Sequence, residues 1–227
     1  MPKAGVAPEV AAIRGEIRRF LDTLDSLGRK IGSAKYGAYA FYDYDGEPIY
    51  VGQTEEMLRS RISRHLTNQR TDAVAMNVLD PFEVAEIQVW PLYQEDVKGD
   101  IGKTLNAIEY TVFQKVLKES SFRAVLNEKD IPKTRLVKLP PSYRSRIIPE
   151  GLYEIRRHPD TRIARRASTI ANLARVISER NVSKGLRRTL LTQARRLERL
   201  AATRLADFTE RYPVEEEGEE TGEEVAE

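Results

Sequence analysis

The feature that most constrains the fold is a stretch of alternating aromatic residues interrupted by Asp45-Gly46. The segment YGAYAFYDYDGEPIYVGQT has the two-residue period that is typical of β-strands. An Asp-Gly pair between two such strands favours a type I′ turn, because that turn needs positive φ at both central residues. The sequence therefore predicts a hairpin with strands near 37–43 and 48–52.

The turn also determines which side chains share a face of the hairpin. If the two residues that flank Asp-Gly pair with each other, Phe41 lies opposite Tyr50 and Tyr39 lies opposite Gly52. Paired residues share a face, so Tyr39 and Tyr50 become diagonal neighbours, and the glycine leaves that face open. The hairpin therefore predicts two phenols that can address one ligand.

The rest of the chain is dominated by helical periodicity. We expect an amphipathic helix over 9–31, a helix capped by Thr54, a third strand over 83–92 and a helix over about 103–118. Residues 128–157 contain four prolines and predict a connector. Segments 161–180 and 184–211 predict an αα-hairpin.

Charge is distributed unevenly, although the formal net charge is only +2. Residues 158–212 carry 13 basic and 5 acidic groups, whereas residues 213–227 carry 8 acidic groups and no basic group. The basic helices can contact phosphates without reading sequence, although a solvated charged face is an equally good interpretation. The acidic segment predicts a disordered tail.

The sequence contains no cysteine and no long apolar run, and this excludes several classes of site and of protein. The chain has no cysteine, which excludes disulfides, thiolate catalysis and cysteine-ligated metal sites. It also has no run of about 18 uncharged apolar residues such as a membrane span needs. We therefore expect a cytoplasmic protein that does not enter a membrane.

A basic pair follows the second strand at helical spacing. Arg61 and His65 are four residues apart, so both project from one side of a helix, away from the stripe of Leu58, Ile62 and Leu66. A basic fork beside two phenols suits a phosphodiester. Each of these residues also has an ordinary interpretation, as strand packing or as solvated surface. Their order along one short segment favours a site.

The motifs that resemble a known family are Gly37-Ala38-Tyr39, Tyr50-Val51-Gly52, Arg61, His65 and Glu109. In this order they are similar to the GIY-YIG nuclease module, over about residues 36–127. The resemblance implies an α+β fold with a small three-stranded antiparallel sheet flanked by helices. It also implies divalent-metal-dependent hydrolysis of DNA. The family's isoleucines are replaced by Ala38 and Val51, whose side chains should point away from the tyrosines.

The resemblance implies a role for each matching residue. The expected catalytic residues are Tyr39, Tyr50, Arg61, His65, Glu109 and Asn127. Tyr39 would take a proton from the attacking water, Arg61 would stabilise charge on the phosphoryl oxygens, and Tyr50 and His65 would orient these groups. Glu109 would hold Mg²⁺ (or Mn²⁺). Asn127 is expected to end the module.

The expected partner is DNA, and the apolar helix stripes allow a homodimer. Candidate phosphate contacts are Arg61, Arg64, Arg165, Arg166, Arg187, Arg188, Arg195 and Arg196. The expected organisation is an N-terminal helix (1–34), a nuclease domain (35–127), a connector (128–157), a basic helical hairpin (158–212) and an acidic tail (213–227).

The predicted function is a restriction-like or phage-defence-like DNA endonuclease, because no zinc-finger or helix-hairpin-helix element is evident. A non-catalytic nucleic-acid-binding module of the same shape and a repair-type nicking nuclease are the alternatives.

Overall fold

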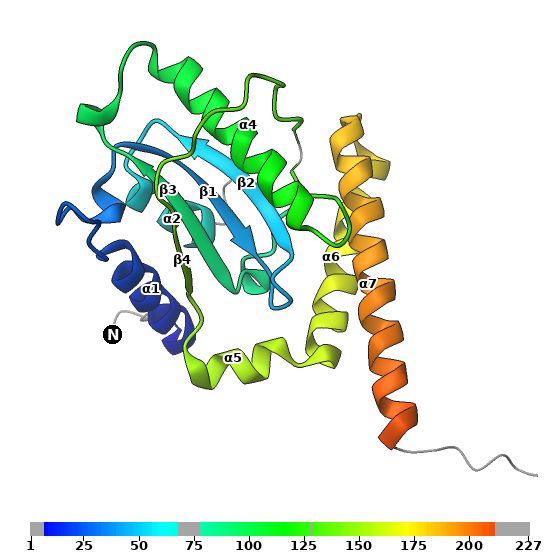
Figure 1. Cartoon of the computed structure of the whole chain (residues 1–227). Coiled ribbons are helices and arrows are strands. Elements are labelled where there is room, and N and C mark those ends of the chain that lie inside the picture. Colours follow the sequence, from blue (N-terminus) through cyan, green and yellow to red (C-terminus); the bar gives the residue numbers. More distant parts are fainter. Residues whose placement is uncertain (1–6, 68–77, 128, 212–227) are drawn as a thin grey trace, which may run out of the picture.

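The computed structural model describes residues 7–67, 78–127 and 129–211 (Figure 1). Its centre is an antiparallel sheet with the strand order β2-β1-β3-β4. The strands are β1 (Tyr36–Tyr42), β2 (Pro48–Thr54), β3 (Glu86–Leu92) and β4 (Tyr143–Arg146). The α+β class is confirmed, but the expectation of three strands is wrong. The fourth strand, YRSR, has no apolar alternation and comes from the segment predicted to be a connector.

The predicted register of the hairpin is confirmed. Tyr39 pairs with Gly52, and Phe41 pairs with Tyr50. The turn itself differs from the prediction, because the Asp43 N–H donates to the Glu47 carbonyl at 2.9 Å and closes a loop of three residues. Gly46 is the loop residue with positive φ, at 74°. An irregularity after Phe41 absorbs the extra residue, so the aromatic pairs keep their register.

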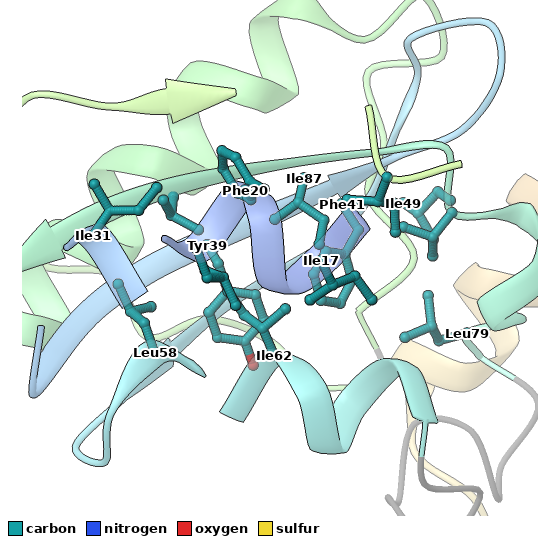
Figure 2. Packing of buried hydrophobic residues seen from close by; sticks show 14 of the residues in the cluster. Ile17, Phe20, Ile31, Tyr39, Phe41, Ile49, Leu58, Ile62, Leu79 and Ile87 are labelled. Atoms are coloured by element: carbon teal, nitrogen blue, oxygen red, sulfur yellow. The ribbon is translucent and has the colours of Figure 1, made fainter. Parts of the chain in front are cut away.

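The two faces of the sheet are covered by different helices (Figure 1). Tyr39 and Phe41 pack with residues of α1 (Pro8–Leu21) and α2 (Leu58–Thr67). Figure 2 shows Tyr39 in this core with Leu58 and Ile62 of α2. Ala38 and Val51 belong to the opposite core, with residues of α4 (Ile101–Glu119). Small residues on the second face let α4 approach the sheet closely.

Helix α1 ends at Leu21, well short of its predicted end. Leu24 and Leu27 continue the apolar spacing, yet they are 57% and 71% exposed. Asp25 accepts a hydrogen bond from the Leu27 N–H at 2.9 Å, and Gly28 has a φ of 74°. An aspartate that bonds nearby N–H groups competes with helical hydrogen bonding, so the chain turns here.

The predicted Thr54 cap is also wrong. Thr54 accepts a hydrogen bond from the Glu56 N–H at 3.1 Å and forms a turn before α2, which begins at Leu58. The third strand is shorter than predicted, because residues 81–83 form a 3₁₀ turn ahead of it.

Three helices follow the sheet: α5 (Glu150–Arg157), α6 (Pro159–Glu179) and α7 (Lys184–Arg211). The last two form the predicted αα-hairpin, which lies beside the end of the sheet (Figure 1). Leu173 and Leu186 bring this hairpin into the same core as Tyr39. Helix α7 continues past that core, where Leu205 and Phe208 are 66% and 53% exposed. None of the described helices has the length and apolar character of a membrane span. The expected acidic tail lies outside the described residues.

Buried ion pairs join the helical hairpin to the β1–β2 turn. We call this group the turn cluster; its members are Asp43, Asp45, Glu47, Glu83, Arg162, Arg165, Arg166 and Arg196. Arg162 binds both carboxylate oxygens of Asp45 at 2.7 Å, and Arg166 lies 3.3 Å from Asp43. Arg196 is 2% exposed and donates to the Pro48 carbonyl at 3.0 Å. Carboxylates and guanidinium groups are equal in number, yet Arg166 Nε and Arg196 Nη1 are buried without a hydrogen-bond partner among the described residues, so the pairing is incomplete.

Candidate active site

The predicted tyrosine, arginine and glycine meet at β2. The Arg61 Nε–H donates to the Tyr39 hydroxyl oxygen at 3.1 Å. A Cβ atom built on Gly52 would lie 2.7 Å from that oxygen and 2.8 Å from Tyr39 Cζ. The phenol of Tyr39 itself therefore occupies the space that the sequence predicted to be open. Gly52 serves the site by admitting this ring.

His65 completes an aromatic group with both tyrosines. Its ring centroid lies 5.8 Å from that of Tyr39 and 5.2 Å from that of Tyr50. Burial, with Arg61 and Arg64 nearby, lowers the pKa of His65 to about 4, so the imidazole is neutral at pH 7. The predicted basic fork therefore carries one positive charge, on Arg61. His65 Nδ1 is buried and has no hydrogen-bond partner among the described residues.

Tyr39 is fully buried. Burial raises the pKa of its phenol above the ordinary value of 10.0, while the Arg61 guanidinium acts in the opposite direction. The larger of these effects is burial, so the hydroxyl is protonated at neutral pH. Tyr50 is only half-buried and lies nearer the surface of the same aromatic group.

Glu109 reaches the site from α4, on the other side of the sheet. This approach is possible because β2 is the outermost strand of the sheet, so groups from both faces can meet along its outer edge. Burial raises the pKa of the Glu109 carboxyl to about 7, although Arg61 and the Gln53 backbone N–H lower it. The carboxylate therefore lies within electrostatic range of the guanidinium that binds Tyr39.

Asn127 binds the same outer edge of β2 at Val51, the residue before Gly52. Its side-chain oxygen accepts from the Val51 N–H at 3.1 Å, and its side-chain N–H donates to the Val51 carbonyl at 2.7 Å. The Leu126 N–H donates to the Ile49 carbonyl at 2.8 Å. Both ends of the Asn127 amide thus bind the strand. This geometry supports a positioning role for Asn127, which fixes β2 and therefore Gly52.

The residues around Glu109 fit a hard divalent cation. Glu109 is a half-buried carboxylate at the β2 edge, and because burial raises its pKa to about 7, a proton competes with a cation for it near neutral pH. No group of three or more carboxylate or histidine side chains with metal-site geometry occurs in the described part of the chain. A single carboxylate suits Mg²⁺, which keeps several of its waters. Glu109 is therefore the residue that would hold the cation.

Apart from Arg61, the arginines predicted to contact phosphates fall into three groups. Arg165, Arg166 and Arg196 belong to the turn cluster, where they bind carboxylates and backbone oxygens of this chain. A contact of these three residues with DNA stays a prediction. Arg187 and Arg195 are exposed on α7.

Two further arginines remain partly exposed and form ion pairs. Arg188 pairs with Asp130, and Arg64 pairs with Glu56. Spacing alone cannot tell the buried arginines from the exposed ones, because their acidic partners lie far away in the sequence.

Two residues at the site were missed from the sequence. Gln53 Nε2–H donates to Asn106 Oδ1 at 2.8 Å, one helical turn before Glu109. The only sequence signal is that Gln53 directly follows the Tyr50-Val51-Gly52 motif.

Comparison with known proteins agrees with this geometry. Residues 35–117 match the family model described as the GIY-YIG catalytic domain. No curated protein and no solved structure matches the chain. The matched residues contain Tyr39, Tyr50, Arg61, His65 and Glu109 in the order given above. Residues 35–117 are therefore similar to the catalytic domain of the GIY-YIG family, whose nucleases act on DNA.

Proposed function

We propose that the protein is a divalent-metal-dependent endonuclease that hydrolyses phosphodiester bonds in DNA. One observation carries this proposal: two phenols, a guanidinium and a neutral imidazole converge over Gly52, at the strand edge where Glu109 lies. Such a set can bind a phosphate, move a proton and hold a cation within one small volume.

Arg61 is the group that binds the phosphate in this proposal. Its Nε–H is used by Tyr39, so its two terminal amino groups are left for phosphoryl oxygens. Among the described residues it forms no ion pair within 4.0 Å with a carboxylate that would compete. Its fixed position lets it stabilise the charge that develops on the phosphoryl group during attack.

Tyr39 is the proposed base for the attacking water, with His65 and Tyr50 orienting the reacting groups. Because burial raises the pKa of the Tyr39 phenol, little phenolate is present at pH 7 and the cleavage rate should rise with pH. Tyr39→Phe should abolish cleavage while DNA affinity is retained. Intact turnover in this variant, measured beside a gel-shift titration, would remove Tyr39 from the base role.

Glu109 would hold the divalent cation, which supplies Lewis-acid stabilisation of the phosphate and of the leaving oxygen when it is bound. The protein's own part is to provide an anionic oxygen at the β2 edge, within electrostatic range of Arg61. The same edge is fixed by Asn127, so a change there should act through the position of β2.

The decisive experiment is incubation of the purified protein with supercoiled plasmid and Mg²⁺. We expect nicked or linear products that disappear with EDTA and in Glu109→Gln. Glu119→Gln removes the same charge from the same helix, at a residue paired with Lys115, and should cut normally. Salt-sensitive DNA binding without cutting under any condition would instead support a non-catalytic binding module.

We propose a restriction-like or phage-defence-like role for this activity. The chain has no cysteine, so a cysteine-ligated zinc finger is excluded, and the basic α6–α7 hairpin is the remaining candidate for DNA positioning. One site per chain implies either sequential nicks or a homodimer for double-strand cutting. Discrete linear fragments, together with the mass of the protein in solution, separate these cases from a repair-type nicking enzyme.

A further inference from the structure

Gln53 is held between the β2 edge and α4, beside Glu109. Its backbone N–H acts on the Glu109 carboxylate, and its side-chain Nε2–H donates to Asn106 Oδ1 at 2.8 Å. Asn106 and Glu109 are three residues apart on α4, so they lie on the same side of that helix. The backbone N–H and the side-chain amide of Gln53 therefore both face the side of α4 that carries Glu109.

The other end of this amide is an unused acceptor. Gln53 Oε1 is buried and has no hydrogen-bond partner among residues 7–67, 78–127 and 129–211. A buried amide oxygen without a hydrogen-bond partner destabilises the fold by about 1–3 kcal/mol. A ligand that bound this oxygen would remove that cost. Most buried polar atoms in proteins are satisfied, and this exception lies near an ionisable carboxylate, where a bound ligand would satisfy it.

We propose that Gln53 Oε1 is the second protein oxygen of the cation site at Glu109. This inference rests on the proposed function, because it assumes that Glu109 holds a divalent cation. An amide carbonyl oxygen is a hard, neutral donor of the kind that Mg²⁺ and Mn²⁺ accept beside a carboxylate. The hydrogen bond to Asn106 fixes the amide and leaves its oxygen available. Glu109 supplies the charge of the site, and Gln53 supplies its second oxygen.

The test measures Mn²⁺ binding to the full chain without DNA, by isothermal titration calorimetry and by electron paramagnetic resonance of free Mn²⁺. Gln53→Met keeps the length of the side chain and removes the oxygen, so we expect binding weaker by about 10-fold. Gln53→Glu adds a second carboxylate, and we expect binding tighter by about 10-fold. Glu109→Gln should abolish binding.

The matched control is Gln88→Met on β3, which makes the same chemical change in the same sheet. Gln88 binds the Tyr42 hydroxyl and Ser142, with β1 between it and the β2 edge. Its substitution should leave Mn²⁺ affinity unchanged. Thermal unfolding of each variant shows whether it folds. If Gln53→Met does not fold, Gln53→Glu alone tests the inference: tighter Mn²⁺ binding supports it, and weaker or unchanged binding overturns it.

The outcomes separate this inference from the proposal on which it rests. If Glu109→Gln loses Mn²⁺ while both Gln53 variants bind like the wild type, the Gln53 inference is overturned and the metal site stands. If Glu109→Gln binds Mn²⁺ as well as the wild type, the metal site itself is overturned. Weaker binding in Gln53→Met together with tighter binding in Gln53→Glu supports both.

Discussion

Gly52→Ala is the most direct test of the packing at the site. The new Cβ would lie 2.7 Å from the Tyr39 hydroxyl oxygen. Ordinary contact needs about 3.5 Å, so the phenol must move by about 0.8 Å. A shift of this size disrupts the 3.1 Å hydrogen bond from Arg61. We expect the free energy of unfolding to fall by about 1–3 kcal/mol, as in other overpacked cores. Cleavage should fall by about 100-fold, because a displacement near 1 Å misaligns the reacting groups.

The assay pairs urea unfolding with the rate of plasmid nicking. Gly15→Ala is the matched control, because this glycine lies within α1 and its added Cβ would meet no atom within 4 Å. At a helix interior the same substitution should stabilise the protein by about 1 kcal/mol and leave nicking unchanged. If Gly52→Ala keeps full stability and full nicking, the close packing of the Tyr39 ring against β2 is refuted.

Three other predictions concern charge. Arg166→Leu leaves Asp43 without one of its partners in the turn cluster, so urea unfolding should show a loss of about 3–5 kcal/mol, whereas exposed Arg187→Leu should change stability by less than about 0.5 kcal/mol. Glu109 has a pKa raised from 4.5 to about 7; between these values the folded protein keeps a proton that the unfolded chain releases, so stability falls as pH rises. Without divalent ions, the free energy of unfolding from urea titrations should fall with rising pH more steeply in the wild type than in Glu109→Gln. Equal pH dependence in the two proteins would contradict this prediction. Arg187→Gln and Arg195→Gln should each lower the slope of log Kd for DNA against log salt by roughly 1, and unchanged slopes would exclude both from the interface.

The hairpin could be predicted from the sequence because its information is local. Alternating aromatics and a turn dipeptide determine a register, and Tyr39 lies opposite Gly52 as expected. Strand β4 could not be predicted, because its residues have no apolar alternation and are strand-like only through pairing with β3. The helix predicted over 9–31 was too long, because Leu24 and Leu27 continue the apolar spacing beyond the end of α1. Asp25 turns the chain there, which the spacing does not reveal.

The sequence named residues that the structure brings together beside β2, but it did not predict their electrostatic state. A motif names Tyr39, His65 and Glu109, whereas burial, which depends on tertiary packing, decides which of them is charged. Arg166 and Arg196 were predicted to contact DNA because a charge count along a helix does not identify its inward face. Their partners come from the other end of the chain, so only the folded structure identifies them.

The turn cluster also has a consequence for the order of folding. Asp45 and Arg162 are 117 residues apart, and Arg196 reaches Pro48 across 148 residues. Contacts of such separation form late, and chains emerge from the ribosome N-terminus first. The strands that carry Tyr39 and Tyr50 are thus synthesised long before the arginines that neutralise the acids at their turn. We expect the hairpin that carries Tyr39 and Tyr50 to reach its final form only after α6 and α7 have been synthesised, so the proposed cleavage of DNA would require both of these late helices.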